Sequence, residues 1–192
     1  AIISIDIAVA NWWRSLGIEP SAVVGHSTGE IAAAHVAGVL SLADTMQVIC
    51  AYGRYIGRFT GQGAMALVSL PWEETTRVLA EFAGRVFPAI HDSAEATVIA
   101  GTPAALGDCI RALESRGVVC RAVNMNVAPH CPLADSVREE LGAALAGISP
   151  QPSRIPLISE VTGTELEGRS LDAAHWVRNF GDAVFFSRAI DT

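Results

Sequence analysis

Residues 65–124 carry the pattern that most restricts the fold of this chain, because hydrophobic periodicity alternates there between the strand type and the helix type. The predicted elements are strands at 65–70, 86–90, 96–101 and 118–124 and helices at 72–82 and 103–116. Pro71 and Pro103 stand at the two helix starts, where proline is favoured. The order βαββαβ is that of a ferredoxin-like fold. We therefore predict a small α+β subdomain at residues 62–124.

The residues on either side of this subdomain predict a larger, mixed α/β body. The predicted elements are helices at 2–16, 30–40, 44–56, 132–145 and 171–180 and strands at 22–24 and 155–161. Residues 1–61 and 125–192 would then form one subdomain into which the smaller one is inserted.

Composition excludes several classes of function. A net charge of −7 argues against a nucleic-acid-binding surface. All 13 basic residues are arginine, so the chain has no Schiff-base lysine, P-loop lysine or Ser-Lys dyad. The longest uncharged stretch, 59–72, is shorter than the roughly 20 residues that a membrane span needs. The four cysteines contain no C-x-x-C pair, so we expect reduced thiols, no metal site and a cytoplasmic location.

Residues 25–29, GHSTG, match the G-x-S-x-G pattern of a nucleophilic serine at a sharp turn between a strand and a helix. The predicted strand before it and the predicted helix after it supply that context. The helix N-terminus would offer free N–H groups to an oxyanion. A capping box is the alternative, with Ser27 and Glu30 capping the helix together. The pattern alone leaves both roles open.

A nucleophilic serine requires a base, and the chain has five histidines. His130 follows Pro129 and closely precedes Pro132, and these prolines restrict the backbone as a positioned base requires. A turn histidine without catalytic function is the alternative. We expect the side chain of His26 to diverge from the adjacent serine. Packing or surface positions are expected for His35, His175 and Cys131.

Three segments resemble the acyltransferase domains of modular polyketide synthases, relatives of malonyl-CoA:acyl carrier protein transacylase. They are VVGHSTGEIAAAHVAG at 23–38, VAPHC at 127–131 and WVRNF at 176–180. The resemblance covers essentially the whole chain. It implies an α/β fold in which an α/β-hydrolase-like large subdomain carries an inserted ferredoxin-like (βαββαβ) small subdomain. It also implies that the large subdomain is incomplete at both ends.

By this resemblance Ser27 is the nucleophile and His130 the base, the Thr28 backbone N–H binds the oxyanion, and the Asn179 backbone carbonyl orients the histidine. The family's second oxyanion donor lies in a Gly-Gln-Gly segment upstream of the serine, and residues 1–26 contain no such segment. Acyl-CoA would acylate Ser27, and the phosphopantetheine thiol of an acyl carrier protein would then take the acyl group. No permanently bound cofactor is implied. The implied partners are the carrier protein, acyl-CoA and neighbouring polyketide synthase domains.

Relatives that transfer malonyl or methylmalonyl groups bind the free carboxylate with an arginine at the position of Tyr52. Tyrosine offers one neutral donor in place of a bidentate cation, and Arg54 lies about 200° around the helix from it. The tetrapeptide that ends at the histidine, VAPH, leaves more apolar room than the family's usual residues. His91 matches a further site position, with an ordinary strand-end histidine as the alternative. The expected acyl pocket contains His26, Tyr52, His91, Val127 and Pro129.

These departures favour a neutral, short or branched acyl group, and therefore a starter-unit (loading) acyltransferase. One alternative is an acyl hydrolase that uses the same serine and histidine with water as acceptor. Others are an extender-unit acyltransferase with an unusual pocket and a catalytically silent docking domain.

Overall fold

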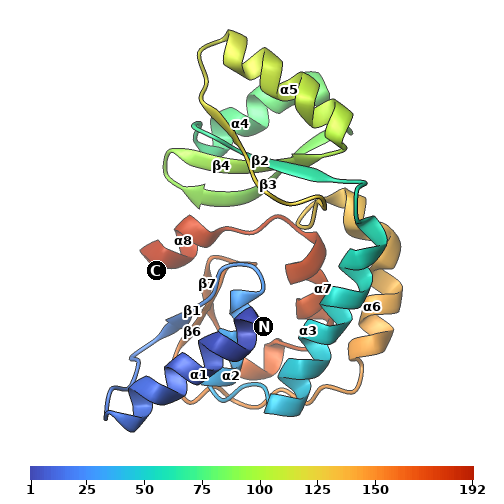
Figure 1. Ribbon diagram of the computed structural model, residues 1–192. Helices are drawn as coiled ribbons and strands as arrows, with labels where there is room; N and C mark the ends of the chain where they lie inside the picture. Colours follow the sequence, from blue (N-terminus) through green and yellow to red (C-terminus); the bar gives the residue numbers. More distant parts are fainter.

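The computed structural model describes all residues 1–192 and divides them between two groups of elements, each built on one sheet (Figure 1). The α-helices are α1 (Ile2–Ser15), α2 (Gly29–Val36), α3 (Leu42–Ile56), α4 (Trp72–Val78), α5 (Pro103–Ser115), α6 (Arg138–Leu145), α7 (Ala173–Gly181) and α8 (Phe186–Asp191). Short 3-10 helices lie at Gly57–Phe59, Leu79–Phe82, Pro132–Val137 and Gly168–Ser170. The strands are β1 (Val23–Val24), β2 (Ala64–Val68), β3 (Val86–Ser93), β4 (Ala96–Gly101), β5 (Cys120–Ala122), β6 (Leu157–Ser159) and β7 (Thr164–Leu166).

The smaller subdomain is a four-stranded antiparallel sheet in the order β3-β4-β2-β5, with α4 and α5 on one face (Figure 1). Along β2, alternate side chains face opposite sides of the sheet. Ala66 and Val68 pack under the helices with Leu106. Met65 faces the other way and packs in a cluster with Ala128 and Cys131 of the larger subdomain. The face without helices therefore lies against the segment that carries His130.

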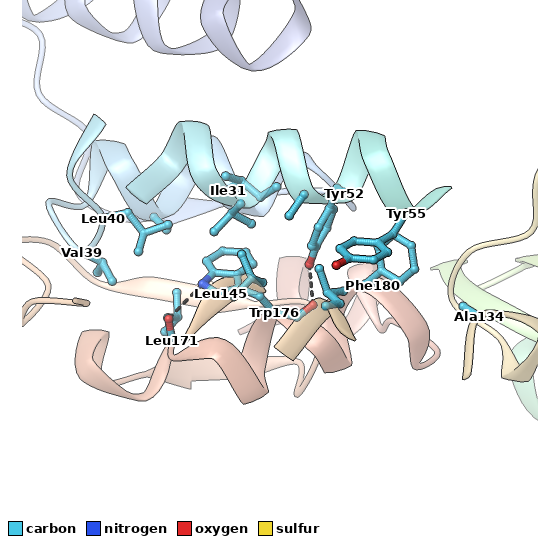
Figure 2. Close-up of a cluster of buried hydrophobic side chains, with 14 of the residues drawn as sticks. Ile31, Val39, Leu40, Tyr52, Tyr55, Ala134, Leu145, Leu171, Trp176 and Phe180 are labelled. Atoms are coloured by element: carbon cyan, nitrogen blue, oxygen red, sulfur yellow. Dashed lines mark hydrogen bonds between the residues drawn. The ribbon is translucent and has the colours of Figure 1, made fainter. Parts of the chain in front are cut away.

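The larger subdomain has a sheet in the order β1-β6-β7, in which β1 and β6 are parallel and β7 is antiparallel to β6. Seventeen buried residues form its core, which lies among α2, α3, α6 and α7. Figure 2 shows Trp176 at the centre of this core, where its indole Nε1–H donates a hydrogen bond of 2.9 Å to the Leu171 carbonyl. Burial of so large a side chain fixes α7 against α3.

The predicted fold class is confirmed. The strand order of the inserted sheet is that of a ferredoxin-like fold, and its strands lie within residues 64–122. The helix predicted at 132–145 is divided into a 3-10 segment and α6. The hydrophobic pattern of the sequence does not predict two short elements, β7 and α8. The exact subdomain boundaries at 61/62 and 124/125 stay a prediction.

Helix α1 differs from its expected packing. Its periodicity predicts a broad buried face, yet only Ile3 and Ile7 are buried. Trp12 and Trp13 are 58% and 45% exposed, and their rings lie 5.5 Å apart. None of the helices has both the length and the apolar character needed to cross a membrane.

Candidate active site

Ser27 stands in a sharp turn between β1 and α2. Its φ angle is 54°, a left-handed conformation that residues with a side chain seldom adopt. The turn is tight enough that a Cβ on Gly25 would lie 2.2 Å from the backbone nitrogen of Glu30. Glycine is therefore required at the first motif position, whereas a Cβ on Gly29 would meet no atom within 4 Å. This geometry projects the serine hydroxyl away from the backbone.

His130 supplies the partner of that hydroxyl. Its Nε2 lies 2.8 Å from the Oγ of Ser27, although 103 residues separate the two. The φ angle of His130 is 59°, and these two are the only non-glycine residues of the chain with positive φ. Such strain persists where the surrounding structure imposes it and is concentrated at functional sites. The structure thus brings together the predicted nucleophile and the predicted base.

The surroundings of His130 keep its imidazole neutral. The side chain is 2% exposed, and the backbone N–H donates to the Phe180 carbonyl at 3.1 Å. Burial lowers the pKa of His130 to about 4, and nearby His26 adds to this effect. The backbone carbonyls of Asn179 and Asp182 act in the opposite direction. A neutral imidazole can accept the serine proton at neutral pH.

The predicted contact between His130 and the Asn179 carbonyl is only partly formed. That carbonyl lies close enough to raise the histidine pKa, and so does the Asp182 carbonyl, which the sequence did not indicate. Nδ1 of His130 nevertheless has no hydrogen-bond partner of ordinary geometry.

The capping-box alternative is wrong. The residue that precedes α2 is Thr28, and it makes no side-chain cap. The Ser27 hydroxyl bonds to His130, and the Glu30 carboxylate accepts bonds from elsewhere in the fold. Among the backbone hydrogen bonds of turns, loops and helix caps, none has the N–H of Thr28 as its donor. This donor is therefore free for an oxyanion at the start of a helix.

Glu30 lies in a fully buried polar network behind the serine. Its carboxylate accepts the hydroxyl of Ser159 at 2.7 Å and the backbone N–H of Glu160 at 3.0 Å, and it lies 2.8 Å from Nε2 of His175. The side-chain amide of Asn179 donates to it at 3.4 Å. His175 is thus a member of a buried ion-pair or hydrogen-bond network rather than only a packing residue. Nδ1 of His175 and Oε2 of Glu160 have no hydrogen-bond partner, so the network is only partly satisfied.

Glu160 was missed by sequence reasoning. It follows β6, and the carboxyl end of β6 lies beside that of β1 because the two strands are parallel. Residues that follow adjacent parallel strands meet at one sheet edge, which was the signal available. Burial, and then the Glu30 carboxylate, raise the pKa of Glu160 to about 9, against opposing effects of the Ser27 backbone and the Asn179 side chain. Glu160 is therefore protonated at neutral pH.

Tyr52 lies at the boundary between the core and the cavity. Its hydroxyl donates a hydrogen bond of 2.6 Å to the Trp176 carbonyl (Figure 2) and also lies 3.0 Å from Oδ1 of Asn179. Its ring meets Phe180 edge to face at 5.0 Å. Burial, with the carboxyl groups of Glu30 and Glu160, raises its pKa well above the usual value, so the phenol stays neutral. The Tyr52 hydroxyl is therefore already engaged by two protein oxygens.

A cavity of about 1340 Å³ opens in front of Ser27 and His130, and most of its lining residues are hydrophobic. From the small sheet, Met65, Ile90 and Val98 line it. Its one arginine, Arg14, is bonded to the Glu19 carboxylate and to the Val36 carbonyl. Of the predicted pocket residues, the cavity is lined by His26, Tyr52 and Pro129.

Two predicted pocket residues lie elsewhere. Val127 lines a separate hollow formed by residues 123–127, because the backbone on its C-terminal side packs against Gly63. His91 stacks beside Trp72 at 5.8 Å, and its Nδ1 is buried without a partner. Register shifts on both sides of His91 in β3 change the direction of its side chain. His91 is not among the residues that line the cavity in front of Ser27, and it lies within β3, two residues before the end of that strand.

The side chains next to the reacting pair have distinct surroundings. His26 lines the cavity, as expected of a pocket residue, and its side chain lies 3.6 Å from the Asp92 carboxylate and meets the Phe186 ring at 4.6 Å. Cys131 is buried, and burial raises the pKa of its thiol to about 11, so it is no thiolate nucleophile. No group of three or more His, Cys, Asp or Glu side chains is placed to hold a metal ion.

Comparison with known protein families shows to which family the chain belongs. The family described as "Acyl transferase domain" matches residues 1–192. The chain belongs to the acyl transferase domain family. Among sequence relatives, this acyl transferase domain is 39% identical over 190 residues to the spectinabilin polyketide synthase system protein NorA of Streptomyces orinoci, covering 99% of the chain and 10% of NorA. It is 37% identical over 190 residues to the erythronolide synthase EryA3 of Saccharopolyspora erythraea, covering 98% of the chain and 6% of EryA3.

Solved structures agree with the sequence relatives. The domain superposes on the acyltransferase domain from module 8 of the salinomycin polyketide synthase with a TM-score of 0.96 and 35% identity, covering 98% of this chain and 45% of that one. It superposes on a loading acyltransferase from the avermectin modular polyketide synthase with a TM-score of 0.92 and 38% identity, covering 97% and 60%. The chain thus spans about half the length of these acyltransferase structures and a small part of the synthases.

Proposed function

We propose that this domain transfers an acyl group from acyl-CoA to the phosphopantetheine thiol of an acyl carrier protein. The observation that carries the proposal is the 2.8 Å contact between the Ser27 hydroxyl and the buried His130 imidazole, at the turn between β1 and α2. A serine next to a neutral base is activated as a nucleophile, and a free N–H at the start of α2 can stabilise the oxyanion.

The reaction proceeds in two balanced steps. Ser27 Oγ attacks the thioester carbonyl carbon while His130 Nε2 takes its proton, and the C–S bond then breaks as the proton passes to the departing CoA thiolate. The carrier-protein thiol next attacks the serine ester, giving its proton to His130. The C–O bond breaks, the acyl group leaves on the new sulfur, and His130 returns the proton to Ser27. No bound cofactor is needed for either step.

The acyl group that the pocket favours is neutral, and short or branched. The cavity walls are largely apolar, and the guanidinium of Arg14 is already occupied by protein oxygens. Tyr52 stands where relatives that transfer dicarboxylic acyl groups have arginine, and its hydroxyl is hydrogen-bonded within the core. An unpaired carboxylate buried there would be costly. These features support a starter-unit role, and one superposable structure is a loading acyltransferase.

The proposed partners follow from the same chemistry. The donor is acyl-CoA, and the acceptor is a carrier protein whose phosphopantetheine arm reaches Ser27. The matched relatives are polyketide synthases of which this chain covers a small part. We therefore place the domain beside other domains of such a synthase.

A competition among acyl-CoAs tests the proposal. The full-length protein is mixed with equal amounts of propionyl-, isobutyryl-, malonyl- and methylmalonyl-CoA, and acyl-Ser27 is identified by mass spectrometry of its peptide. We expect propionyl and isobutyryl groups to predominate, with no label on a Ser27→Ala protein. Preferential malonyl or methylmalonyl labelling would refute the starter-unit role. Absence of any label would refute the enzymatic function.

The acceptor is tested separately, because a hydrolase would form the same acyl-serine. The lifetime of acyl-Ser27 is measured in buffer and after addition of carrier protein bearing phosphopantetheine. We expect slow loss in buffer and rapid transfer to the carrier protein. Equal rates under both conditions would instead identify a hydrolase.

A further inference from the structure

The two catalytic steps above leave a buried acid unused. Glu160 is fully buried at the end of β6, behind Ser27. One carboxyl oxygen, Oε1, accepts a long hydrogen bond of 3.4 Å from the Asn179 amide. The other, Oε2, is buried without any hydrogen-bond partner. No arginine forms an ion pair with Glu160, so the chain provides no positive charge that would favour loss of its proton.

Tyr52 connects this acid to the acyl pocket. Its hydroxyl bonds to Oδ1 of Asn179, and the amide nitrogen of the same Asn179 side chain donates to Glu160 and to Glu30 (Figure 2 shows Tyr52 beside Trp176 and Phe180). Burial raises the pKa of Tyr52 well above its usual value, and the nearby Glu30 and Glu160 carboxyl groups act in the same direction. The side-chain amide of Asn179 therefore connects the Tyr52 hydroxyl to the carboxyl groups of Glu30 and Glu160.

The two acids are not equivalent. Glu30 is already satisfied by Ser159, the Glu160 backbone and His175. Glu160 has a free oxygen and holds a proton at neutral pH, because burial raises its pKa to about 9. A guanidinium introduced at position 52 would favour loss of this proton. The resulting carboxylate offers a bidentate partner within the protein, and that partner competes with any carboxylate on the substrate.

We propose that Glu160 restricts the acyl groups that position 52 can be changed to accept, because a cation introduced there would pair with Glu160 and not with an acyl carboxylate. The inference rests on the proposed function, since it concerns how the acyl pocket would treat a carboxylated acyl group. The neutral phenol of Tyr52 is compatible with the neutral acid behind it. Changing the tyrosine alone would create an internal ion pair instead of a substrate site. Both positions must change before a carboxylated acyl group is accepted.

A double-mutant cycle in the full-length protein tests this proposal with wild type, Y52R, E160Q and Y52R/E160Q. Each protein receives equal propionyl-CoA and methylmalonyl-CoA, and the ratio of the two acyl groups on Ser27 is measured. We expect the propionyl preference in wild type, E160Q and Y52R. In Y52R/E160Q the share of methylmalonyl should rise about tenfold or more, because its carboxylate gains a charged partner.

Thermal melting of the same four proteins provides a second measurement that does not depend on activity. The internal ion pair should make Y52R fold and melt above Y52R/E160Q, in which the introduced guanidinium lacks its carboxylate. An unfolded Y52R, or a double variant at least as stable, would overturn the proposal. So would a methylmalonyl gain in Y52R equal to that in the double variant. Failure of the proposed function is distinct, since it appears in wild type as a preference for methylmalonyl.

Discussion

The two glycines of the GHSTG turn should respond in opposite ways to alanine. A Cβ on Gly25 would lie 2.2 Å from the nitrogen of Glu30 and 2.2 Å from the carbonyl carbon of Gly29. Non-bonded carbon atoms are most stable about 3.5–4.0 Å apart, so the turn must open by more than about 1 Å. Overpacking of this kind costs about 1–3 kcal/mol of folding free energy. A shift of about 1 Å at a reacting atom also lowers the rate about 100-fold.

Gly29 is the matched control from the same motif. Its added Cβ would meet no atom within 4 Å, and it is the first residue of α2. Alanine in a helix is more stable than glycine by about 0.5–1 kcal/mol. We therefore expect Gly29→Ala to acylate at nearly the wild-type rate and to melt slightly higher, by about 2–4 °C per kcal/mol for a domain of this size.

The assay follows formation of acyl-Ser27 in a single turnover by intact-protein mass spectrometry, with melting recorded on the same samples. Gly25→Ala should form acyl-enzyme about 100-fold more slowly than wild type. Acylation by Gly25→Ala at the wild-type rate would show that the turn tolerates a methyl group and that the reasoning is wrong. An equal loss in Gly29→Ala would show that both glycines are needed for another reason.

Four further predictions concern the site and the buried network. Ser27→Ala should form no acyl-enzyme yet remain folded, as measured by peptide mass spectrometry and circular dichroism. The acylation rate should be constant between pH 6 and 8 and fall about tenfold per pH unit below about 4, because His130 must be neutral to accept a proton; a limb near pH 6.5 in single-turnover rates would contradict the buried site. Tyr52→Phe should cost about 1–3 kcal/mol in urea unfolding, since two buried oxygens lose their donor. Glu160 keeps its proton up to about pH 9 in the folded protein, whereas the unfolded chain releases it near pH 4.5. The free energy of unfolding should therefore fall as the pH rises across that interval. Glu160→Gln should reduce this pH dependence, as measured by urea unfolding at several pH values.

Hydrophobic periodicity predicted the main elements because most of the helices and strands bury one face. The six elements of the small subdomain follow from this rule, with Pro103 at the start of α5. It failed at α1, whose apolar residues are largely exposed, because periodicity reports a hydrophobic face but not whether another element covers it. Three-residue β7 and six-residue α8 are too short to show a period.

The reacting pair could be predicted because Ser27 and His130 each lie in a local motif. The buried network could not, because its contacts join distant positions: Glu30 and His175 are 145 residues apart. For His91, knowledge of the strand was insufficient, since the irregular register of β3 determines where that side chain points. Sequence patterns indicate elements and motifs, whereas side-chain direction at a bulge depends on the neighbouring strand.

The left-handed backbone at Ser27 and His130 also bears on how this domain can change over evolutionary time. Strained residues of this kind cost of order 1–3 kcal/mol each, out of a net stability that is only about 5–15 kcal/mol for most domains. Glycine would relieve that cost at either position. A lineage released from acyl transfer would therefore gain stability by mutating the very residues that perform it. Retention of a serine and a histidine at these two positions distinguishes a domain still under selection for chemistry from one kept only as a scaffold.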